Sequence, residues 1–325
     1  MSVLITGGNG MVGAALVSLL LSKGEQVAVF DINFNTNLLS KQQKQRVTFI
    51  QGDLSMYEEV IEAVEKTRPE IIYHLASMLS VPCEADPHTG LQVNGFGSYN
   101  ILEAARMFKV RQVIYSSSLS IYANNIPEDK YIDQNTVERP STIYAVTKLF
   151  VEQLGYYYKV KYGLDFRAVR FSSLVGPGAK VRHISAYNAW MIEKSYLGEP
   201  FEIYVKPDNY VTLTYYKDAA ECLFQLGVAP LEKIKTVCYN LPGQPSRAHE
   251  LATMVEEIIP TAQLSYNPDP DIVAIWEKKG YVEYDDSKAK EEWNWRPKYS
   301  IKEMIIDFGI VLNEMEKNHT EFPEG

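Results

Sequence analysis

Tyr144 and Lys148 stand four residues apart near the start of a segment with helical periodicity, 143–161. That spacing puts a phenol and an ammonium group one turn apart on the same helical face. A nearby ammonium stabilises a phenolate and lowers the pKa of the tyrosine, so the pair could act as a base near neutral pH. The same spacing is common in surface helices without such a role, so the interpretation depends on the residues that accompany it.

A run of three serines begins at the last residue of a predicted strand, 112–116. Ligands of open α/β sheets lie at the carboxyl ends of the strands, so this run is well placed for chemistry. We expect the Ser118 hydroxyl to hydrogen-bond a substrate oxygen whose charge changes during the reaction. Ser117, by contrast, suits a turn or a helix cap. The predicted catalytic residues are therefore Ser118, Tyr144 and Lys148.

A glycine-rich turn joins the first predicted strand to the first predicted helix, and its glycines are Gly7, Gly10 and Gly13. They suit a tight turn, a close approach of the backbone to a pyrophosphate, and close packing of the helix on the strand. The N–H groups of Met11 and Val12 at the helix start would face the phosphates, where the helix dipole favours negative charge. A glycine turn that binds no ligand can have the same spacing, so the neighbouring elements decide whether this turn is predicted to bind a dinucleotide.

Two aspartates follow the second and third predicted strands. Asp31 can accept hydrogen bonds from the adenosine ribose hydroxyls. Ile32 follows it and no arginine is adjacent, so a 2′-phosphate would be repelled and NAD is favoured over NADP. Asp53 could accept from the adenine amino group, or it could instead cap the next helix.

Strand-length apolar runs alternate with helical segments through the first half of the chain, which is typical of a doubly wound parallel sheet. The predicted strands are 3–6, 26–30, 47–50, 71–75, 112–116 and 166–170. The predicted helices are 11–23, 57–66, 90–108 and 143–161. We therefore predict an α/β protein with a Rossmann fold, whose NAD-binding domain covers residues 1–175.

The regular alternation of strand and helix patterns ends at 176–178, and longer irregular stretches and shorter elements follow. We predict a smaller C-terminal α/β lobe, 176–325, that mainly binds substrate. Its predicted elements are helices at 185–196 and 216–226, strands near 201–204 and 263–266, and a closing amphipathic helix at 301–314. A strand near 237–241 is expected to return to the main sheet.

Together these features resemble the extended short-chain dehydrogenase/reductase superfamily, the NAD-dependent epimerases and dehydratases, over essentially the whole chain. The residues that carry the resemblance are the glycine motif, Asp31, Asp53, Leu75-Ala76-Ser77, Asn94, the serine run and Tyr144-x-x-x-Lys148. The resemblance implies that Tyr144 is the acid/base, that Lys148 also holds the nicotinamide ribose, and that Ser118 orients the substrate. It further implies that NAD contacts Ile32, Leu54, Leu75, Ala76, Ser77, Asn94, Ser116, Tyr144, Lys148 and Phe171.

Two branches of this superfamily compete. Nucleotide-sugar 4-epimerases of the UDP-glucose type hold a diphosphate with fixed cations. Their pattern would place asparagine at Ser173 and Arg-Asp-Phe at 211–213, and neither is present. Segments 77–80, 139–144 and 156–167 instead resemble short-chain L-threonine dehydrogenases. We therefore favour an NAD-dependent oxidoreductase that oxidises a secondary alcohol, or reduces the ketone, of a small polar substrate; the epimerase is the alternative.

The resemblance to threonine dehydrogenases is incomplete around the substrate, because their Pro-Gly and Gly-Thr-Thr-Asp stretches are replaced here by 171–173 and 183–186. The substrate is therefore not fixed as threonine. The residues predicted to contact it are Ser80 at its polar head, Ser118 and Tyr144 at the reacting hydroxyl, and Ser172, Arg182 and His183. Arg182 and His183 could hold a carboxylate or phosphate, or could form a solvated loop. Lys180 is a weaker candidate of the same kind.

The chain has a formal net charge of -9 and no basic run, which argues against a nucleic-acid partner. Its three cysteines and five histidines lack metal-ligand spacing, so we expect no metal site and buried thiols in a reducing compartment. The N-terminus lacks a basic signal region, and the apolar stretch 14–21 is too short to span a bilayer. The expectation is a cytoplasmic enzyme with a small-molecule substrate and no membrane association.

Tyr99, Tyr156 and Tyr157 lie in the two long helical segments, where aromatic outer positions would suit a four-helix bundle at a two-fold axis. The family resemblance implies such a homodimer, although these positions could instead face the sheet. A non-catalytic NAD(P)-binding regulator is a third possibility for this fold. The intact Ser118, Tyr144 and Lys148 argue against it, because a pure binder has no need of the phenol.

Overall fold

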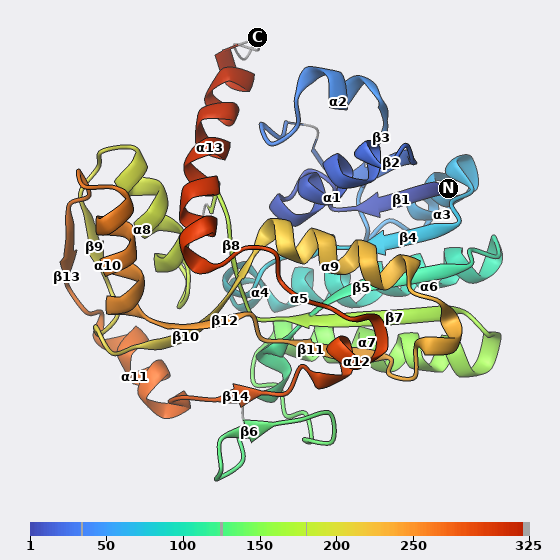
Figure 1. Ribbon diagram of the computed structural model, residues 1–325. Helices are drawn as coiled ribbons and strands as arrows, with labels where there is room; N and C mark the ends of the chain where they lie inside the picture. The colour runs from blue at the N-terminus through green and yellow to red at the C-terminus, as the bar shows by residue number, and fades with distance from the viewer. Residues whose placement is uncertain (34, 124–125, 180, 321–325) are drawn as a thin grey trace.

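The computed structural model describes residues 1–33, 35–123, 126–179 and 181–320. A seven-stranded parallel sheet forms its centre (Figure 1). From one edge to the other, the strands are β3 (Val47–Gln51), β2 (Gln26–Asp31), β1 (Ser2–Thr6), β4 (Ile71–His74), β5 (Gln112–Ser118), β7 (Asp165–Phe171) and β11 (Cys238–Leu241). The winding direction reverses between β1 and β4, which confirms the predicted Rossmann fold and creates a crevice at the strand ends.

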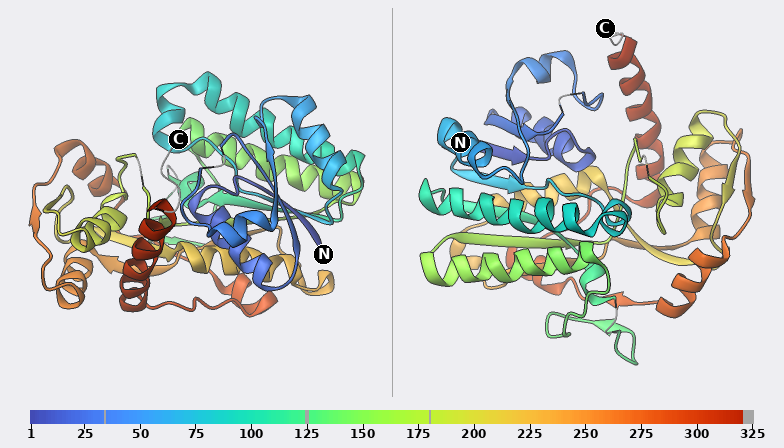
Figure 2. Two further views of the ribbon diagram at one scale, coloured as in Figure 1. Left: turned by 90° about the horizontal axis from the view of Figure 1, so that it is seen from above. Right: turned by 180° about the vertical axis from the view of Figure 1, so that it is seen from behind.

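Helices cover both faces of the sheet (Figure 2). One face carries α1 (Met11–Ser22) and α9 (Tyr216–Val228), and the other carries α3 (Tyr57–Thr67), α6 (Gly97–Met107) and α7 (Ile143–Tyr162). Two apolar clusters fill the layers between sheet and helices, one on each face. Burial on both faces explains why the central strands are continuous apolar runs rather than alternating ones.

The predicted helix 90–108 is interrupted in the structure. It is divided into α5 (Pro87–Gly90), a π-helical segment η1 (Leu91–Phe96) and α6, and the short helix α4 (Ser80–Ala85) precedes them. Asn94 lies inside the π-helical segment and is buried. Such wide turns occur frequently at functional sites, and periodicity alone cannot distinguish them from a regular helix.

The second lobe is built from two small sheets and the helices that pack on them. Its strands are β8 (Ser173–Val175), β10 (Tyr210–Tyr215) and β12 (Gln244–Arg247) in one sheet, and β9 (Phe201–Ile203) and β13 (Leu264–Tyr266) in the other. Its helices are α8 (Tyr187–Tyr196), α10 (Ala248–Ile258), α11 (Pro270–Lys279) and α13 (Ile301–Thr320), the last longer than predicted.

Two segments of the second half belong to the main sheet. β11 pairs in parallel with β7, so the predicted return of the strand near 237–241 is confirmed. The helix predicted at 216–226 was assigned to the lobe, but α9 packs on α1 and on the main sheet instead, because its apolar face completes that layer.

The remaining elements are short. They are α2 (Lys41–Gln45), η2 (Leu119–Tyr122), β6 (Tyr131–Ile132), η3 (Leu231–Lys233), β14 (Glu283–Tyr284) and α12 (Ser287–Trp293). In the part of the chain that is described, no helix has both the length and the apolar character needed to cross a membrane.

Candidate active site

The start of α7 is fixed by two independent hydrogen bonds. The Thr142 side chain caps the helix by accepting from the Ala145 N–H at 3.2 Å. Glu84 of α4 accepts from the Ile143 N–H at 2.7 Å. Because both bonds act on the first turn, the backbone of Tyr144 has a defined position against α4 and β5.

Lys148 lies one turn further along α7 and is only 2% exposed. Its Nζ donates to the backbone carbonyl of Ser116 at 2.8 Å and to Ser77 Oγ at 3.4 Å. The same atom lies 5.4 Å from the centre of the Tyr144 ring. Burial lowers the pKa of Lys148 to about 8, although Glu152 acts in the opposite direction.

Tyr144 is half-buried, and its pKa is raised to about 12, mainly by burial. A hydrogen bond with Ser118 lowers that pKa, but not enough to offset burial. The expectation that the neighbouring ammonium would bring this pKa near neutrality is therefore wrong for the structure as it stands. The phenol is protonated at neutral pH and can donate its hydrogen.

The serine run differs from its prediction in one respect. β5 extends to Ser118, and Ser118 Oγ caps η2 by accepting from the Ser120 N–H at 3.2 Å. Ser117, which we expected to cap or turn, points the other way and donates to Glu152 Oε1 at 2.5 Å. The cap is therefore Ser118, the same residue whose hydroxyl meets Tyr144.

The glycine turn has the geometry that a dinucleotide needs. Gly7 has φ 75°, and a Cβ at Gly13 would lie 2.1 Å from the Gly7 carbonyl oxygen, so both positions require glycine. A Cβ at Gly10 would meet only that oxygen, at 3.3 Å, which leaves its outer side open. α1 begins at Met11 without a side-chain cap, so the N–H groups of its first turn are available to phosphate oxygens.

Asp31 lies at the end of β2 beside the glycine turn, with its Oδ2 accepting from the Asn9 N–H at 3.1 Å. Both polar atoms of the Asn9 side chain are buried without a partner among the described residues. An orphaned amide next to a carboxylate fits the hydroxyls and phosphates of an adenosine diphosphate. Ile32, which follows, is 58% exposed and adds no positive charge.

The alternative interpretation of Asp53 as a helix cap is wrong, because the N-cap of α3 is Met56 and no side chain in the described part of the protein caps this helix. Asp53 Oδ1 accepts from both the N–H and the hydroxyl of Ser55, each at 2.8 Å, which forms a turn before α3. Leu54 is buried, and its carbonyl accepts from Asn100 Nδ2 at 2.9 Å. The backbone here is therefore held firmly beside the end of β3.

Asn94 holds the loop that follows β4. Its Oδ1 accepts from the Met78 N–H at 2.7 Å, and its Nδ2 donates to the Met78 carbonyl at 2.9 Å. At the other end of this loop, Leu75 N–H bonds the Thr6 carbonyl, and the Ala76 N–H bonds Thr6 Oγ1. The side chain of Asn94 is thus engaged with the loop that carries Ser77.

The predicted substrate contacts fall into two groups. Ser80 begins α4 in the segment after β4, and Ser172 follows β7, with its Oγ 3.0 Å from Thr214 Oγ1. Phe171, which was predicted to contact NAD, is the last residue of β7 and is 3% exposed. Arg182 and His183 instead make contacts within the second lobe. Lys180 lies outside the described residues.

The Arg182 guanidinium pairs with Asp269 at 2.9 Å and lies 4.5 Å from the centre of the Tyr204 ring. The Tyr204 hydroxyl in turn donates to the His183 carbonyl at 2.8 Å, and burial lowers the pKa of His183. Arg182 is therefore paired within the lobe, while its side chain is 51% exposed.

Three charged residues that were not identified from the sequence are connected to the serine run through Ser117, namely Glu138, Glu152 and Arg170. Arg170 lies next to the last residue of the fully buried strand β7 and pairs with both glutamates. A signal was present, because Glu152 follows Lys148 by four residues, and a charge inside a buried strand requires a partner.

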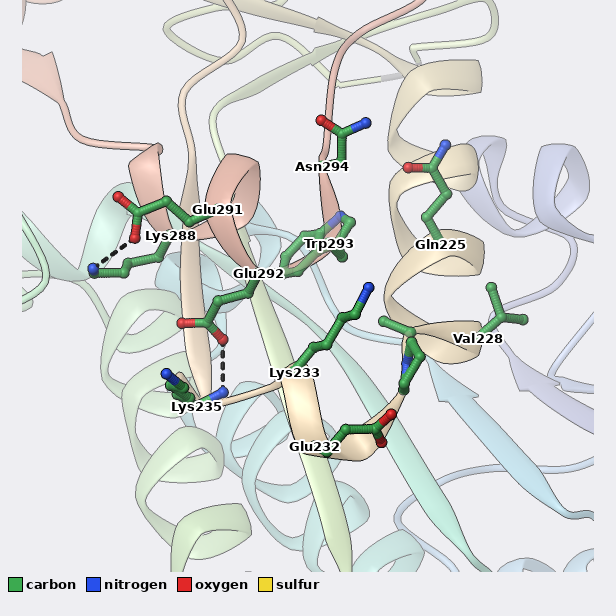
Figure 3. A pocket seen from close by; sticks show the side chains of 12 residues that line it. Gln225, Val228, Glu232, Lys233, Lys235, Lys288, Glu291, Glu292, Trp293 and Asn294 are labelled. Carbon is green, nitrogen blue, oxygen red and sulfur yellow. Dashed lines mark hydrogen bonds and ion pairs between the residues drawn. The ribbon is translucent and has the colours of Figure 1, made fainter.

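Other parts of the structure lie apart from this site. A cavity of about 740 Å³ opens where α9 ends and before β11 begins, at the amino ends of the strands, with Lys233, Glu292 and Trp293 among its lining residues (Figure 3).

No cluster of three or more potential metal ligands occurs in the described ranges. Cys83, Cys222 and Cys238 are free thiols.

Comparisons with known proteins agree with this geometry. Residues 3–241 match the model of the NAD dependent epimerase/dehydratase family. The mitochondrial L-threonine 3-dehydrogenase of Bos taurus is 29% identical over 311 residues, which cover 93% of this chain and 80% of that protein.

Solved structures extend the likeness. The L-threonine 3-dehydrogenase of Trypanosoma brucei superposes with a TM-score of 0.85 at 26% identity, covering 98% of both chains. The UDP-glucose 4-epimerase of Thermus thermophilus, solved with NAD, gives a TM-score of 0.79 at 26% identity, covering 97% of this chain and 99% of that one. The chain therefore belongs to the NAD dependent epimerase/dehydratase family, within the extended short-chain dehydrogenases/reductases, and its cofactor is NAD.

Proposed function

We propose that this enzyme oxidises a secondary alcohol of a small polar substrate, or reduces the corresponding ketone, and that L-threonine is the first substrate to test. The observation that carries the proposal is the meeting of Ser118, Tyr144 and Lys148 at the carboxyl end of β5. The likeness to threonine dehydrogenases over almost the whole chain supports it.

In this proposal Ser118, Tyr144 and Lys148 each have a different role in the reaction. The Ser118 oxygen accepts a hydrogen bond from the Ser120 N–H, and its hydroxyl hydrogen, which bonds Tyr144 in the structure, would turn to the substrate oxygen in the substrate complex. In the reductive direction Tyr144 delivers its hydroxyl proton to that oxygen, and in the oxidative direction its phenolate removes the proton. Lys148 stabilises the phenolate. When bound, NAD supplies the hydride acceptor or donor.

Lys148 has a second role in the same proposal. An ammonium group has three hydrogens, and two of them face Ser116 and Ser77. The third is available to a ribose hydroxyl of the cofactor. The glycine turn and Asp31 would hold the adenosine diphosphate end.

We propose that residues 1–175 bind NAD and that residues 176–325 mainly bind the substrate, as expected from the sequence. Ser80, Ser172, Arg182 and His183 stay substrate-side candidates. Arg182 is engaged with Asp269, so it would have to leave that partner to bind an anionic group.

The second candidate is a nucleotide-sugar 4-epimerase. The likeness to an epimerase solved with NAD favours it. Against it stands the pairing of Arg182, the one arginine among the predicted substrate contacts, with Asp269, because a diphosphate needs fixed cations. A non-catalytic regulator is the remote third possibility.

A homodimer and a cytoplasmic location also remain proposals. α6 and α7 pack together on one side of the sheet, and they expose Tyr99, Tyr156, Tyr157 and Val160. An apolar and aromatic face of this kind suits pairing with a second copy.

The test is reduced-nicotinamide absorbance with purified protein, NAD and a panel of substrates. The panel contains threonine, other β-hydroxy acids, small diols and UDP-sugars. NADH formation with a free secondary alcohol supports the proposal. A response to UDP-sugars alone, or isomerised sugar without net NADH, would favour the epimerase.

A further inference from the structure

The serine run of β5 is joined to one face of α7 by three successive contacts. The pairs are Tyr144 with Ser118, Lys148 with Ser116, and Glu152 with Ser117. Positions spaced by four residues lie on the same helical face, so the helix and the strand end are held side by side over two turns. Only the first two contacts involve residues of the proposed reaction.

The third contact is part of a buried ionic group. Arg170 donates from Nε to Glu152 Oε1 at 2.9 Å and from Nη2 to Glu152 Oε2 at 2.6 Å. The exposed fraction is 5% for the arginine side chain and 0% for the glutamate. In the sheet, Arg170 is flanked by Ser117 of β5 and Asn240 of β11. A bidentate pair in this position has a defined geometry.

The same guanidinium reaches the segment that leads into α7. Its Nη2 also donates to Glu138 Oε1 at 2.8 Å, and its Nη1 donates to the Tyr122 hydroxyl of η2. Glu138 precedes Tyr144 by six residues and its side chain is 25% exposed. Arg170 therefore connects the sheet, the catalytic helix and the segment before it.

We propose that Arg170, with Glu152 and Glu138, is a positioning group that sets where Tyr144 stands relative to Ser118. The inference rests on the proposed function, because it assigns these residues to the geometry of that reaction. Burying an ion pair costs solvation and is weak support for stability alone, whereas it can specify one arrangement among several. None of the three residues contacts the substrate; they act through α7 and the serine run.

The test uses Glu138→Gln, because Glu138 is partly exposed and its loss leaves the Arg170–Glu152 pair in place. The matched control is Glu128→Gln, an exposed glutamate of the same connecting segment. We expect kcat to fall about tenfold in Glu138→Gln, as one charge-assisted hydrogen bond is lost. KM, NAD affinity and Tm should stay close to those of the wild type. Glu138→Asp keeps the charge and should recover part of kcat.

Hydrogen–deuterium exchange provides a readout that does not depend on turnover. Glu138→Gln should exchange faster in peptides covering 139–147, and Glu128→Gln should not. If Glu138→Gln matches its control in both kcat and exchange, the positioning group is refuted. A fall in Tm with faster exchange across the sheet would also refute it, as a merely structural role. If the wild type turns over no substrate, the proposed function fails, and the exchange result alone decides the positioning.

Discussion

Lys148 donates a hydrogen bond from Nζ to the backbone carbonyl of Ser116 at 2.8 Å, which joins the helix of Tyr144 to the strand of Ser118. The acceptor is a backbone atom, so the bond does not use the side chain at position 116. The ammonium is thereby oriented before the cofactor and the substrate bind, and such preorganisation is what electrostatic catalysis requires.

Tyr144→Phe removes the proposed proton donor and acceptor and keeps the ring. We expect kcat to fall about 100-fold or more, the usual contribution of general acid–base catalysis. NAD affinity, measured by quenching of protein fluorescence, should change little. Tyr266→Phe, in the distant strand β13, is the matched control and should keep full activity. Turnover of Tyr144→Phe at the wild-type rate would remove the catalytic assignment.

Two substitutions in the glycine turn should affect different properties, one the stability of the fold and the other the affinity for NAD. Gly13→Ala would put a Cβ 2.1 Å from a backbone oxygen, so we expect the free energy of unfolding to fall by about 1–3 kcal/mol. Gly10→Ala meets only a 3.3 Å contact, and the fold should tolerate it. Gly10→Ala should nevertheless weaken NAD binding about tenfold, if the diphosphate approaches this backbone. Thermal melts and NAD titrations of both variants test this, and wild-type NAD affinity in Gly10→Ala would contradict it.

Burial of Lys148 should make stability depend on pH in a defined direction. Its pKa in the folded chain, about 8, lies below the ordinary value of 10.5. Between these values the unfolded chain binds more protons, so stability rises with pH. Relative to Lys148→Met, the wild type should gain about 2 kcal/mol from about pH 7 to about pH 9.5. Urea unfolding at both pH values measures this difference, and a constant difference would show that the lysine is not desolvated.

The proposed dimer interface can be tested with a substitution that introduces one charged side chain. Val160 is 69% exposed on α7, so Val160→Glu should disrupt an apolar interface but leave an isolated subunit folded. Leu197→Glu, at a 55% exposed position after α8, is the control. Sedimentation velocity should show a dimer for the wild type and the control, and monomers for Val160→Glu. A monomeric wild type would refute the homodimer.

Much of the fold could be predicted because periodicity and burial are strongly coupled here. The central strands are apolar runs of strand length, and each lies within a residue or two of its predicted bounds. The position of α9 could not be predicted, because an amphipathic helix does not reveal which of two apolar surfaces it covers. The π-helical turns at Asn94 were likewise hidden, since they add only one residue to a regular pattern.

The site was predictable to the extent that its chemistry is local in sequence. Tyr144 and Lys148 are neighbours on one helix, and the glycine turn is continuous. The partners of Arg170 come from distant segments, so only the structure identifies them. The pKa of Tyr144 also depends on burial, which a spacing rule does not measure.

The most direct measurement follows the hydrogen itself. L-Threonine or another active alcohol, carrying deuterium on the carbinol carbon, is incubated with the enzyme and NAD, and mass spectrometry then locates the label. The account predicts deuterated NADH released in step with ketone, and almost none with Tyr144→Phe. Label that stays on its original carbon while the stereochemistry changes, with no labelled NADH, would contradict it.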